Sequence, residues 1–163
     1  MSFVVRLAKQ RAKFSAAHFT IFNDGSVERL HGHNYEVSVD LIGARLHNGL
    51  LFPFSIGKKL IQDVCDALDE RVLLPANQPW VVIEQQEPCI SVLVKTPQVE
   101  KRYVFPKEDV ILLPVDNTSS EQLALYVSQQ LEPLIRHQLP VVKEFVVRVS
   151  ESAGQSVSLS RRL

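Results

Sequence analysis

Several ranges of this sequence alternate apolar with polar side chains. The clearest is residues 34–45, where every second residue from Tyr35 to Leu41 is apolar and the residues between them are acidic or hydroxyl-bearing. Successive side chains of a strand point to opposite faces, so this pattern indicates a half-buried antiparallel strand. The same reasoning predicts strands over residues 3–19, 34–45, 144–151 and 156–161.

Two other ranges repeat apolar residues every three or four positions, which is the period of an amphipathic helix. The first helix is predicted from Ser55, as its N-cap, to about Leu68. The second begins in the cluster 117–121, whose hydroxyl and acidic side chains favour a helix start, and ends near Gln138. Cys65 lies on the apolar stripe of the first helix and is therefore expected in the core.

The order of these elements is two strands, a helix, a less regular middle part, a second helix and two strands. It predicts an α+β fold, with two helices on one face of an antiparallel four-stranded sheet, in a single domain over residues 1–163. Short strands at 80–84, 90–95 and 101–105 indicate a strand segment inserted at about 76–106.

Composition narrows the class of protein. Lys+Arg and Asp+Glu both count 18, so the formal net charge is zero, which argues against a nucleic-acid partner. The apolar stretches are too short to span a bilayer and the first residues lack a signal-peptide core, so we expect no membrane contact. The two cysteines are far apart in sequence, which favours a reducing, cytoplasmic location over a disulfide scaffold.

Three histidines carry the candidate chemistry. His31 and His33 stand two apart in an extended segment, in phase with the apolar face that begins at Tyr35, so their side chains point the same way. His18 ends another alternating run. Three neutral imidazoles with an open position form a known catalytic zinc arrangement, although the same ligands suit several divalent ions. The sequence therefore predicts a metal site on these residues.

Five motifs then occur in order over nearly the whole chain, and together they resemble the 6-pyruvoyl-tetrahydropterin synthase family, which includes 6-carboxy-tetrahydropterin synthases. They are Phe-Ser-Ala-Ala-His18, Leu-His-Gly-His-Asn-Tyr35, Leu68-Asp69, Asn117-Thr-Ser-Ser-Glu121 and Val149-Ser-Glu151.

The resemblance implies the tunnelling fold, a homohexamer of two stacked trimers with active sites at subunit interfaces, and a small pterin substrate. It also implies Zn²⁺ on the three histidines, where the ion would bind the hydroxyls of the pterin side chain and lower their pKa. Glu151 is expected to grip the edge of the pterin ring, and Ser119 and Ser120 to support the pterin.

Most family members place a catalytic cysteine a few residues before the two-histidine motif, and this chain has none there. Glu28 lies three residues before His31. This spacing resembles a branch of the family in which glutamate replaces the cysteine, and whose members convert 7,8-dihydroneopterin triphosphate to 6-hydroxymethyl-7,8-dihydropterin. Glu28 is accordingly expected to act as a base.

Two further positions differ from the family pattern. Asp69 is present, but Glu70 stands where the family has the histidine of a proton relay. A carboxylate replaces an imidazole in that role only if burial or nearby charges raise its pKa. Pro53 also replaces a usual aspartate.

The leading hypothesis is a zinc-dependent lyase of the folate route, with Glu28 as base and Asp69 and Glu70 in the relay. Arg29, Lys58 and Lys59 are candidate contacts for the triphosphate. One alternative is 6-carboxy-tetrahydropterin synthesis on the deazapurine (queuosine) route, against which the missing cysteine counts. Another is a catalytically impaired pterin-binding protein, which the missing relay histidine favours.

Overall fold

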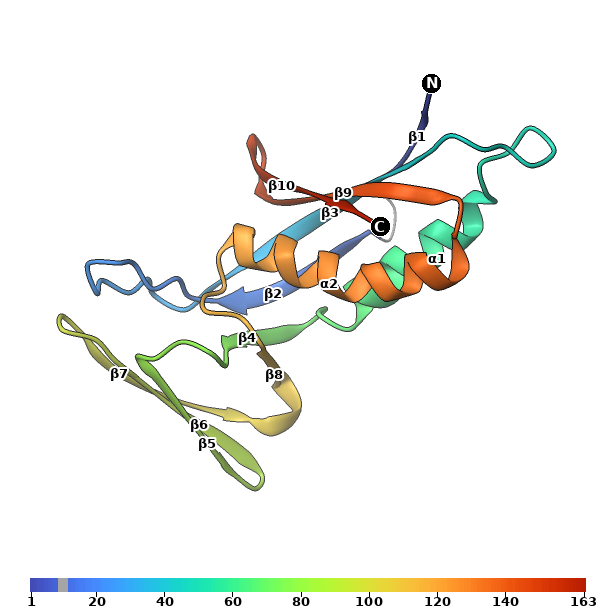
Figure 1. The fold of residues 1–163 in the computed structure, drawn as a ribbon. Helices are drawn as coiled ribbons and strands as arrows, with labels where there is room; N and C mark the ends of the chain where they lie inside the picture. Colours follow the sequence, from blue (N-terminus) through green and yellow to red (C-terminus); the bar gives the residue numbers. More distant parts are fainter. Residues whose placement is uncertain (9–11) are drawn as a thin grey trace.

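The computed structural model describes residues 1–8 and 12–163 of the chain (Figure 1). Its elements follow in the order β1 Phe3–Leu7, β2 Lys13–His18, β3 His31–Gly43, α1 Phe54–Asp66, β4 Arg71–Pro75, β5 Val81–Gln86, β6 Cys89–Lys95, β7 Glu100–Pro106, the 3₁₀ turn η1 Lys107–Asp109, β8 Val110–Leu113, α2 Ser120–Gln138, β9 Val142–Ser152 and β10 Gln155–Arg162.

The main sheet has the strand order β10-β9-β3-β2-β4-β8, and β1 pairs with β3 beyond the end of β2. The long strand β3 lies at its centre, with β9 antiparallel on one side and β2 antiparallel on the other. The α+β class is confirmed, but the prediction of a four-stranded antiparallel sheet is wrong. β4 and β8 extend the sheet in parallel pairing, and such short strands carry no readable alternation when parallel pairing buries both of their faces.

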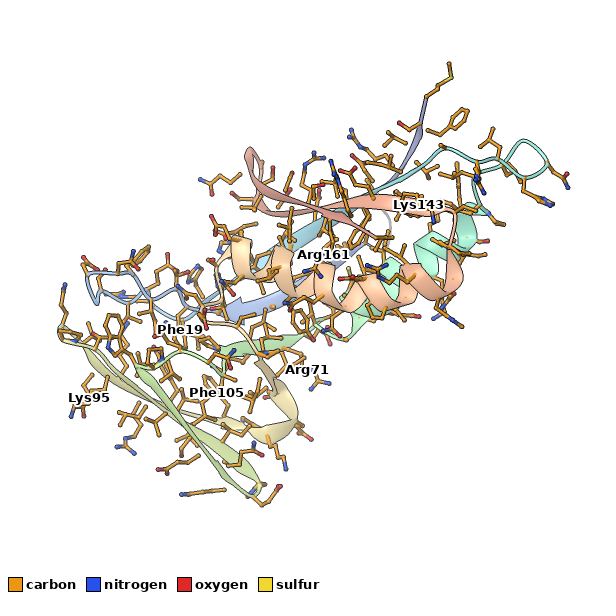
Figure 2. All side chains as sticks on the ribbon, in the orientation of Figure 1. Phe19, Arg71, Lys95, Phe105, Lys143 and Arg161 are labelled. Carbon is orange, nitrogen blue, oxygen red and sulfur yellow. The ribbon has the colours of Figure 1, made fainter. Side chains whose placement is uncertain are left out.

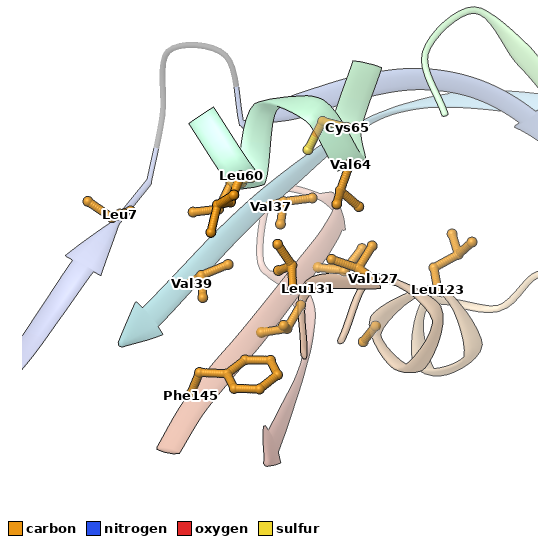
Figure 3. Close-up of a cluster of buried hydrophobic side chains, with 14 of the residues drawn as sticks. Leu7, Val37, Val39, Leu60, Val64, Cys65, Leu123, Val127, Leu131 and Phe145 are labelled. Carbon is orange, nitrogen blue, oxygen red and sulfur yellow. The ribbon is translucent and has the colours of Figure 1, made fainter. Parts of the chain in front are cut away.

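Both helices cover one face of the sheet and enclose the main core (Figures 1 and 3). The alternation of β3 decides which side chains enter this core, since Val37 and Val39 are fully buried between polar neighbours. The other contributors shown in Figure 3 come from both helices, from β9 and from β1, and include Leu60, Val64, Cys65, Leu123, Val127, Leu131, Phe145 and Leu7.

Several predicted boundaries change, and β3 begins at His31 instead of residue 34. The strand predicted over residues 3–19 is divided into β1 and β2, and residues 9–11 of that range lie outside the described residues. Ser55 is not the cap of α1, because the extended backbone of Pro53 (φ −66°, ψ 124°) occupies the N-cap position and makes no side-chain capping bond. The helix start at Ser119–Ser120 and its end at Gln138 agree with the sequence prediction.

The inserted segment is confirmed as a separate antiparallel sheet, β5-β6-β7. It has its own small core, to which Leu74 of β4 and Phe19, the residue that follows β2, also contribute. Phe19 stacks on Tyr103, with ring centroids 5.6 Å apart, and Tyr103 stacks on Phe105 at 5.8 Å (Figure 2). Within the described part of the chain, neither helix combines the length and apolar character needed to cross a bilayer.

Candidate metal centre

The antiparallel pairing of β2 with β3 builds the histidine cluster. His18 is the direct cross-strand partner of His31, and His33 follows two residues later on the same face of β3. The ring centroids are 4.7 Å apart for His18 and His31, 4.8 Å for His31 and His33, and 5.3 Å for His18 and His33. One candidate ligand atom from each ring lies within 4.8 Å of the others. The structure thus brings together the three residues that the sequence singled out.

Backbone carbonyls orient two of the rings. The Nδ1 of His18 lies 2.9 Å from the carbonyl oxygen of Thr118, and the Nδ1 of His31 lies 2.7 Å from that of Arg29. Because a carbonyl can only accept, each Nδ1 is assigned the proton and each Nε2 keeps a lone pair. This is how ligand imidazoles are usually held in metal sites.

Burial disfavours the charged form of His18, and a metal ligand must be neutral. Its side chain is 1% exposed. Burial lowers its pKa most, the hydrogen bond with the Thr118 carbonyl opposes this, and the neighbouring His31 and His33 lower it further.

The donor set fits a divalent cation. The Nε2 atoms of His18 and His33 are buried without a hydrogen-bond partner, which is an unfavourable arrangement unless something else binds them. Nitrogens at the usual zinc distance can be at most about 4.2 Å apart across one ion, so a small inward movement of the rings would complete the site.

Glu151 connects the cluster to the start of α2. Its Oε1 lies 3.5 Å from Nε2 of His33, and its Oε2 accepts a hydrogen bond of 2.8 Å from the Ser120 hydroxyl. Ser119 has a different task, since its hydroxyl caps α2 by accepting the backbone N–H of Gln122 at 3.5 Å. Glu151 and Ser120 are therefore beside the histidines, while the Ser119 hydroxyl is engaged by the helix.

Tyr35 lies at the base of the histidine cluster. The sequence pattern placed it only on the apolar face of the strand. Its ring stacks on Phe14 at 4.8 Å and meets those of His18 and His33 edge-on at 5.8 and 5.7 Å. Its buried hydroxyl has no partner. Burial raises the pKa of this hydroxyl, and the charges of Glu151 and Glu28 raise it further. The sequence could have indicated this position, because Tyr35 follows His33 by two residues and its side chain is therefore on the same face of the strand.

Glu28 lies on the loop that joins β2 to β3, and so between His18 and His31 in the chain. It is half-buried. Its Oε2 accepts the backbone N–H of Thr20 at 3.0 Å, and its own N–H donates to the Thr20 carbonyl at 3.0 Å.

Asp69 and Glu70 contact the backbone of Ser15 on β2. Asp69 Oδ1 accepts the backbone N–H of Ser15 at 2.7 Å, and the Glu70 N–H donates to the Ser15 carbonyl at 2.7 Å. Ser15 is three residues, about 10 Å, from His18 along β2.

Glu70 also borders a cavity of about 510 Å³ whose lining includes Ala17, Gly32 and His33, so this acid and one histidine of the cluster line the same cavity. Among the hydrogen bonds of the described residues, neither acid bonds to a histidine side chain, and their part in a proton relay stays a prediction.

The candidate triphosphate contacts on α1 are remote from the cluster. Gly57 of α1 packs so closely on Leu41 of β3 that an added Cβ would touch its side chain. Leu41 lies ten residues beyond His31 on β3, which is about 30 Å along the strand, so this part of α1 is far from the histidines. Lys58 and Lys59 are the next two residues, and Lys59 pairs with Asp63 on its own helix. Arg29 is exposed beside the cluster, where its carbonyl holds His31.

A curled mixed sheet, two helices on one face and three histidines on adjacent strands define a tunnelling-fold protein with a candidate metal centre. The chain belongs to the 6-pyruvoyl tetrahydropterin synthase family, whose model matches residues 7–162. This is a family of pterin-binding enzymes.

Similar proteins agree with this placement. The 6-pyruvoyl tetrahydropterin synthase of Plasmodium vivax is 31% identical, with a TM-score of 0.90 over 100% of this chain and 99% of that one. The Plasmodium falciparum enzyme is 30% identical, with a TM-score of 0.90 over 99% of both chains. A candidate 6-carboxy-5,6,7,8-tetrahydropterin synthase of Methanocaldococcus jannaschii is 31% identical over 153 residues, which cover 93% of this chain and 91% of the relative.

Two further structures of the P. vivax enzyme bear on the site. In them a glutamate described as a catalytic residue is replaced by alanine or by cysteine.

Proposed function

We propose that this protein is a zinc-dependent lyase that acts on 7,8-dihydroneopterin triphosphate and cleaves its side chain to give 6-hydroxymethyl-7,8-dihydropterin or a related 6-substituted tetrahydropterin. The observation that carries the proposal is the position of Glu28. Its carboxylate is fixed on the loop between two candidate metal ligands, in a chain with no cysteine in that loop. A catalytic glutamate in the similar P. vivax enzyme supports the same reading.

His18, His31 and His33 would hold the metal. When bound, zinc would supply Lewis acidity that makes the hydroxyls of the pterin side chain more acidic.

Glu28 would accept the proton of one such hydroxyl. The bond between the carbon that bears this hydroxyl and the carbon attached to the pterin ring then breaks, and its electron pair passes into the conjugated ring. The hydroxyl-bearing carbon leaves as an aldehyde that carries the triphosphate, and a proton returns to the carbon attached to the ring. A carboxylate is suited to this step when it is held in place rather than free to rotate, which the Thr20 N–H achieves for Glu28.

Glu151 would orient the ring. A carboxylate can accept two parallel N–H bonds from the guanidine-like edge of a pterin, which is a strong and planar interaction. Glu151 is half-buried and lies at the end of the strand face that carries Val147 and Val149, so an unpaired charge there would be unfavourable. The Ser120 hydroxyl keeps one oxygen of this carboxylate in place.

Asp69 and Glu70 would serve the site of a neighbouring copy. Within the described residues neither acid bonds to a histidine side chain, and the Asp69 carboxylate is instead engaged by the Ser15 N–H, which supports this part of the proposal. A homohexamer of two trimers, with sites between subunits, is the assembly that the family resemblance implies and that such an arrangement requires.

A second candidate function is 6-carboxy-tetrahydropterin synthesis. It is favoured by the M. jannaschii relative, which carries that description and matches over nine-tenths of both chains. The loop before the two-histidine motif is the feature that separates the two candidates, since it carries Glu28 and no thiol.

The deciding experiment is incubation of the zinc-loaded protein with 7,8-dihydroneopterin triphosphate, followed by mass-spectrometric identification of the pterin products. We expect 6-hydroxymethyl-7,8-dihydropterin, and we expect its loss both after zinc removal and in the Glu28→Gln variant. A 6-carboxy product would favour the second function. Tight pterin binding without any product would overturn both and leave a binding protein.

A further inference from the structure

The loop that carries Glu28 is anchored first at its base, next to α2. The Asn117 side chain accepts the Ile21 N–H at 3.2 Å and donates to the Ile21 carbonyl at 2.7 Å. The Thr118 hydroxyl donates to the Phe19 carbonyl at 2.7 Å. These contacts fix the first part of the loop, but they do not reach residues 24–28.

The tip of the β6–β7 hairpin holds that outer part (Figure 1). The Thr96 hydroxyl donates to the Gly25 carbonyl at 2.6 Å, and the Gln98 amide donates to the Asp24 carbonyl at 2.6 Å. The approach is close, because a Cβ on Gly25 would lie 3.1 Å from the Pro97 side chain, and the φ of +87° at Gly25 disfavours any other residue.

Among the residues of the β6–β7 hairpin that contact the loop, Lys101 is the one that bonds to Glu28 itself. Its ammonium donates to the Glu28 carbonyl at 2.9 Å and to the Val27 carbonyl at 3.2 Å. Lys101 and Tyr103 are two residues apart on β7, so their side chains lie on the same face of the inserted sheet. Tyr103 stacks on Phe19, at the start of the loop, so this face is turned toward the loop. The lysine therefore fixes the peptide group that precedes Glu28 and the one that follows it.

We propose that Lys101 is a positioning residue for Glu28, and that the inserted β5-β6-β7 sheet forms part of the frame of the active site. The inference rests on the proposed role of Glu28 as base. Lys101 holds the backbone of Glu28 from one side and the Thr20 N–H holds its carboxylate from the other. Without the Lys101 ammonium, the Glu28 carboxylate could still accept a proton, but the backbone that carries it would be held less firmly.

The test compares Lys101→Met with Lys101→Arg and with the control Lys95→Met. Lys95 lies on the same hairpin, but its ammonium is exposed and pairs with Glu100 instead of the loop (Figure 2). With 7,8-dihydroneopterin triphosphate as substrate, we expect Lys101→Met to lower kcat about 10- to 100-fold with less than about a threefold change in KM, since a displaced base impairs the reaction more than binding. Arginine has enough donors for both carbonyls and should restore most of the rate.

Hydrogen exchange gives a readout besides activity. The backbone amides of residues 20–28 should exchange about tenfold faster in Lys101→Met, while those of β3 and β9 stay unchanged. Faster exchange across the whole main sheet would instead make Lys101 a general stabilising residue and would overturn the proposal. A wild-type kcat in Lys101→Met would overturn it as well.

A double variant separates this inference from the proposed function. If Lys101 acts through Glu28, then adding Lys101→Met to Glu28→Gln lowers the rate no further. A full additional loss would show that Lys101 acts elsewhere. If Glu28→Gln alone keeps wild-type turnover, it is the role of Glu28 as base that fails.

Discussion

The Ser120 hydroxyl donates a hydrogen bond of 2.8 Å to Oε2 of Glu151, and the other oxygen of that carboxylate lies 3.5 Å from Nε2 of His33. Ser120 is the first residue of α2, and Glu151 lies near the end of β9. This contact joins the helix start to the histidine cluster and gives the carboxylate one fixed orientation.

Replacing Ser120 with alanine should weaken pterin binding about tenfold, because a hydrogen bond to a charged group is worth about 1.5–3 kcal/mol. Ser119→Ala is the matched control. It should lower stability by about 0.5–1 kcal/mol through loss of the helix cap and leave affinity unchanged. Fluorescence titration with a pterin and thermal unfolding measure the two effects. Equal affinities in both variants would remove Ser120 from the pterin site.

Each of the three histidines should be needed for metal binding. Alanine at His18 or His33 should weaken zinc binding by more than about 100-fold, since partners that only orient a ligand are worth about 10- to 100-fold. His137→Ala, at an exposed position near the end of α2, serves as the control. Metal analysis after dialysis and the absorption spectrum of the cobalt-substituted protein report the outcome. One equivalent of zinc in His18→Ala would contradict the site.

Two inactive variants should complement each other if Glu70 serves the site of another copy. Co-expressed His31→Ala and Glu70→Gln chains, purified through a different tag on each, should recover about a quarter of the wild-type activity by random assortment at the interfaces. No recovery is expected if a site uses the histidines and the acid of one chain. Full activity of Glu70→Gln alone would exclude this residue from the relay.

Cys65 should be inert in the native protein. It is fully buried, and burial, followed by the charges of Asp66 and Asp69, raises the pKa of its thiol to about 12. At pH 8 a disulfide reagent should modify only the partly exposed Cys89, and the second thiol should react only after unfolding. Rapid labelling of native Cys89→Ser protein would show that α1 opens readily.

The pair between Arg6 and Asp40 should make stability depend on acidic pH. Arg6 joins β1 to β3 through two contacts of 2.7 Å, and this hydrogen bonding lowers the pKa of the Asp40 carboxyl. Because the folded pKa lies below the unfolded value of about 4, the stabilisation is complete above that pH and is lost as the pH falls through the folded pKa.

Urea unfolding of the wild type between pH 6 and about pH 2 should therefore show a loss of stability that is smaller in Arg6→Gln and in Asp40→Asn. An identical pH dependence in all three proteins would exclude this pair as its source.

The sequence by itself determined the elements whose evidence is local. Alternation around Val37 and Val149 depends only on which side chains avoid water, so β3 and β9 could be read directly, as could the helix start at Ser119–Ser120. The histidine cluster followed from the same alternation, because the spacing of His31 and His33 fixes their common face once the segment is a strand. The family resemblance added Glu28 and Glu151.

Only the tertiary structure decided relationships that depend on pairing between distant segments. The parallel strands β4 and β8 are too short to show a local pattern. The N-cap of α1 is Pro53 and not the predicted Ser55, because the position of a cap depends on backbone geometry. The contact of Lys101 with Glu28 and the contacts of Asp69 and Glu70 with Ser15 join residues more than 50 positions apart in the sequence. Such contacts are set by sheet register and by the packing of one sheet on another, which no run of neighbouring residues specifies.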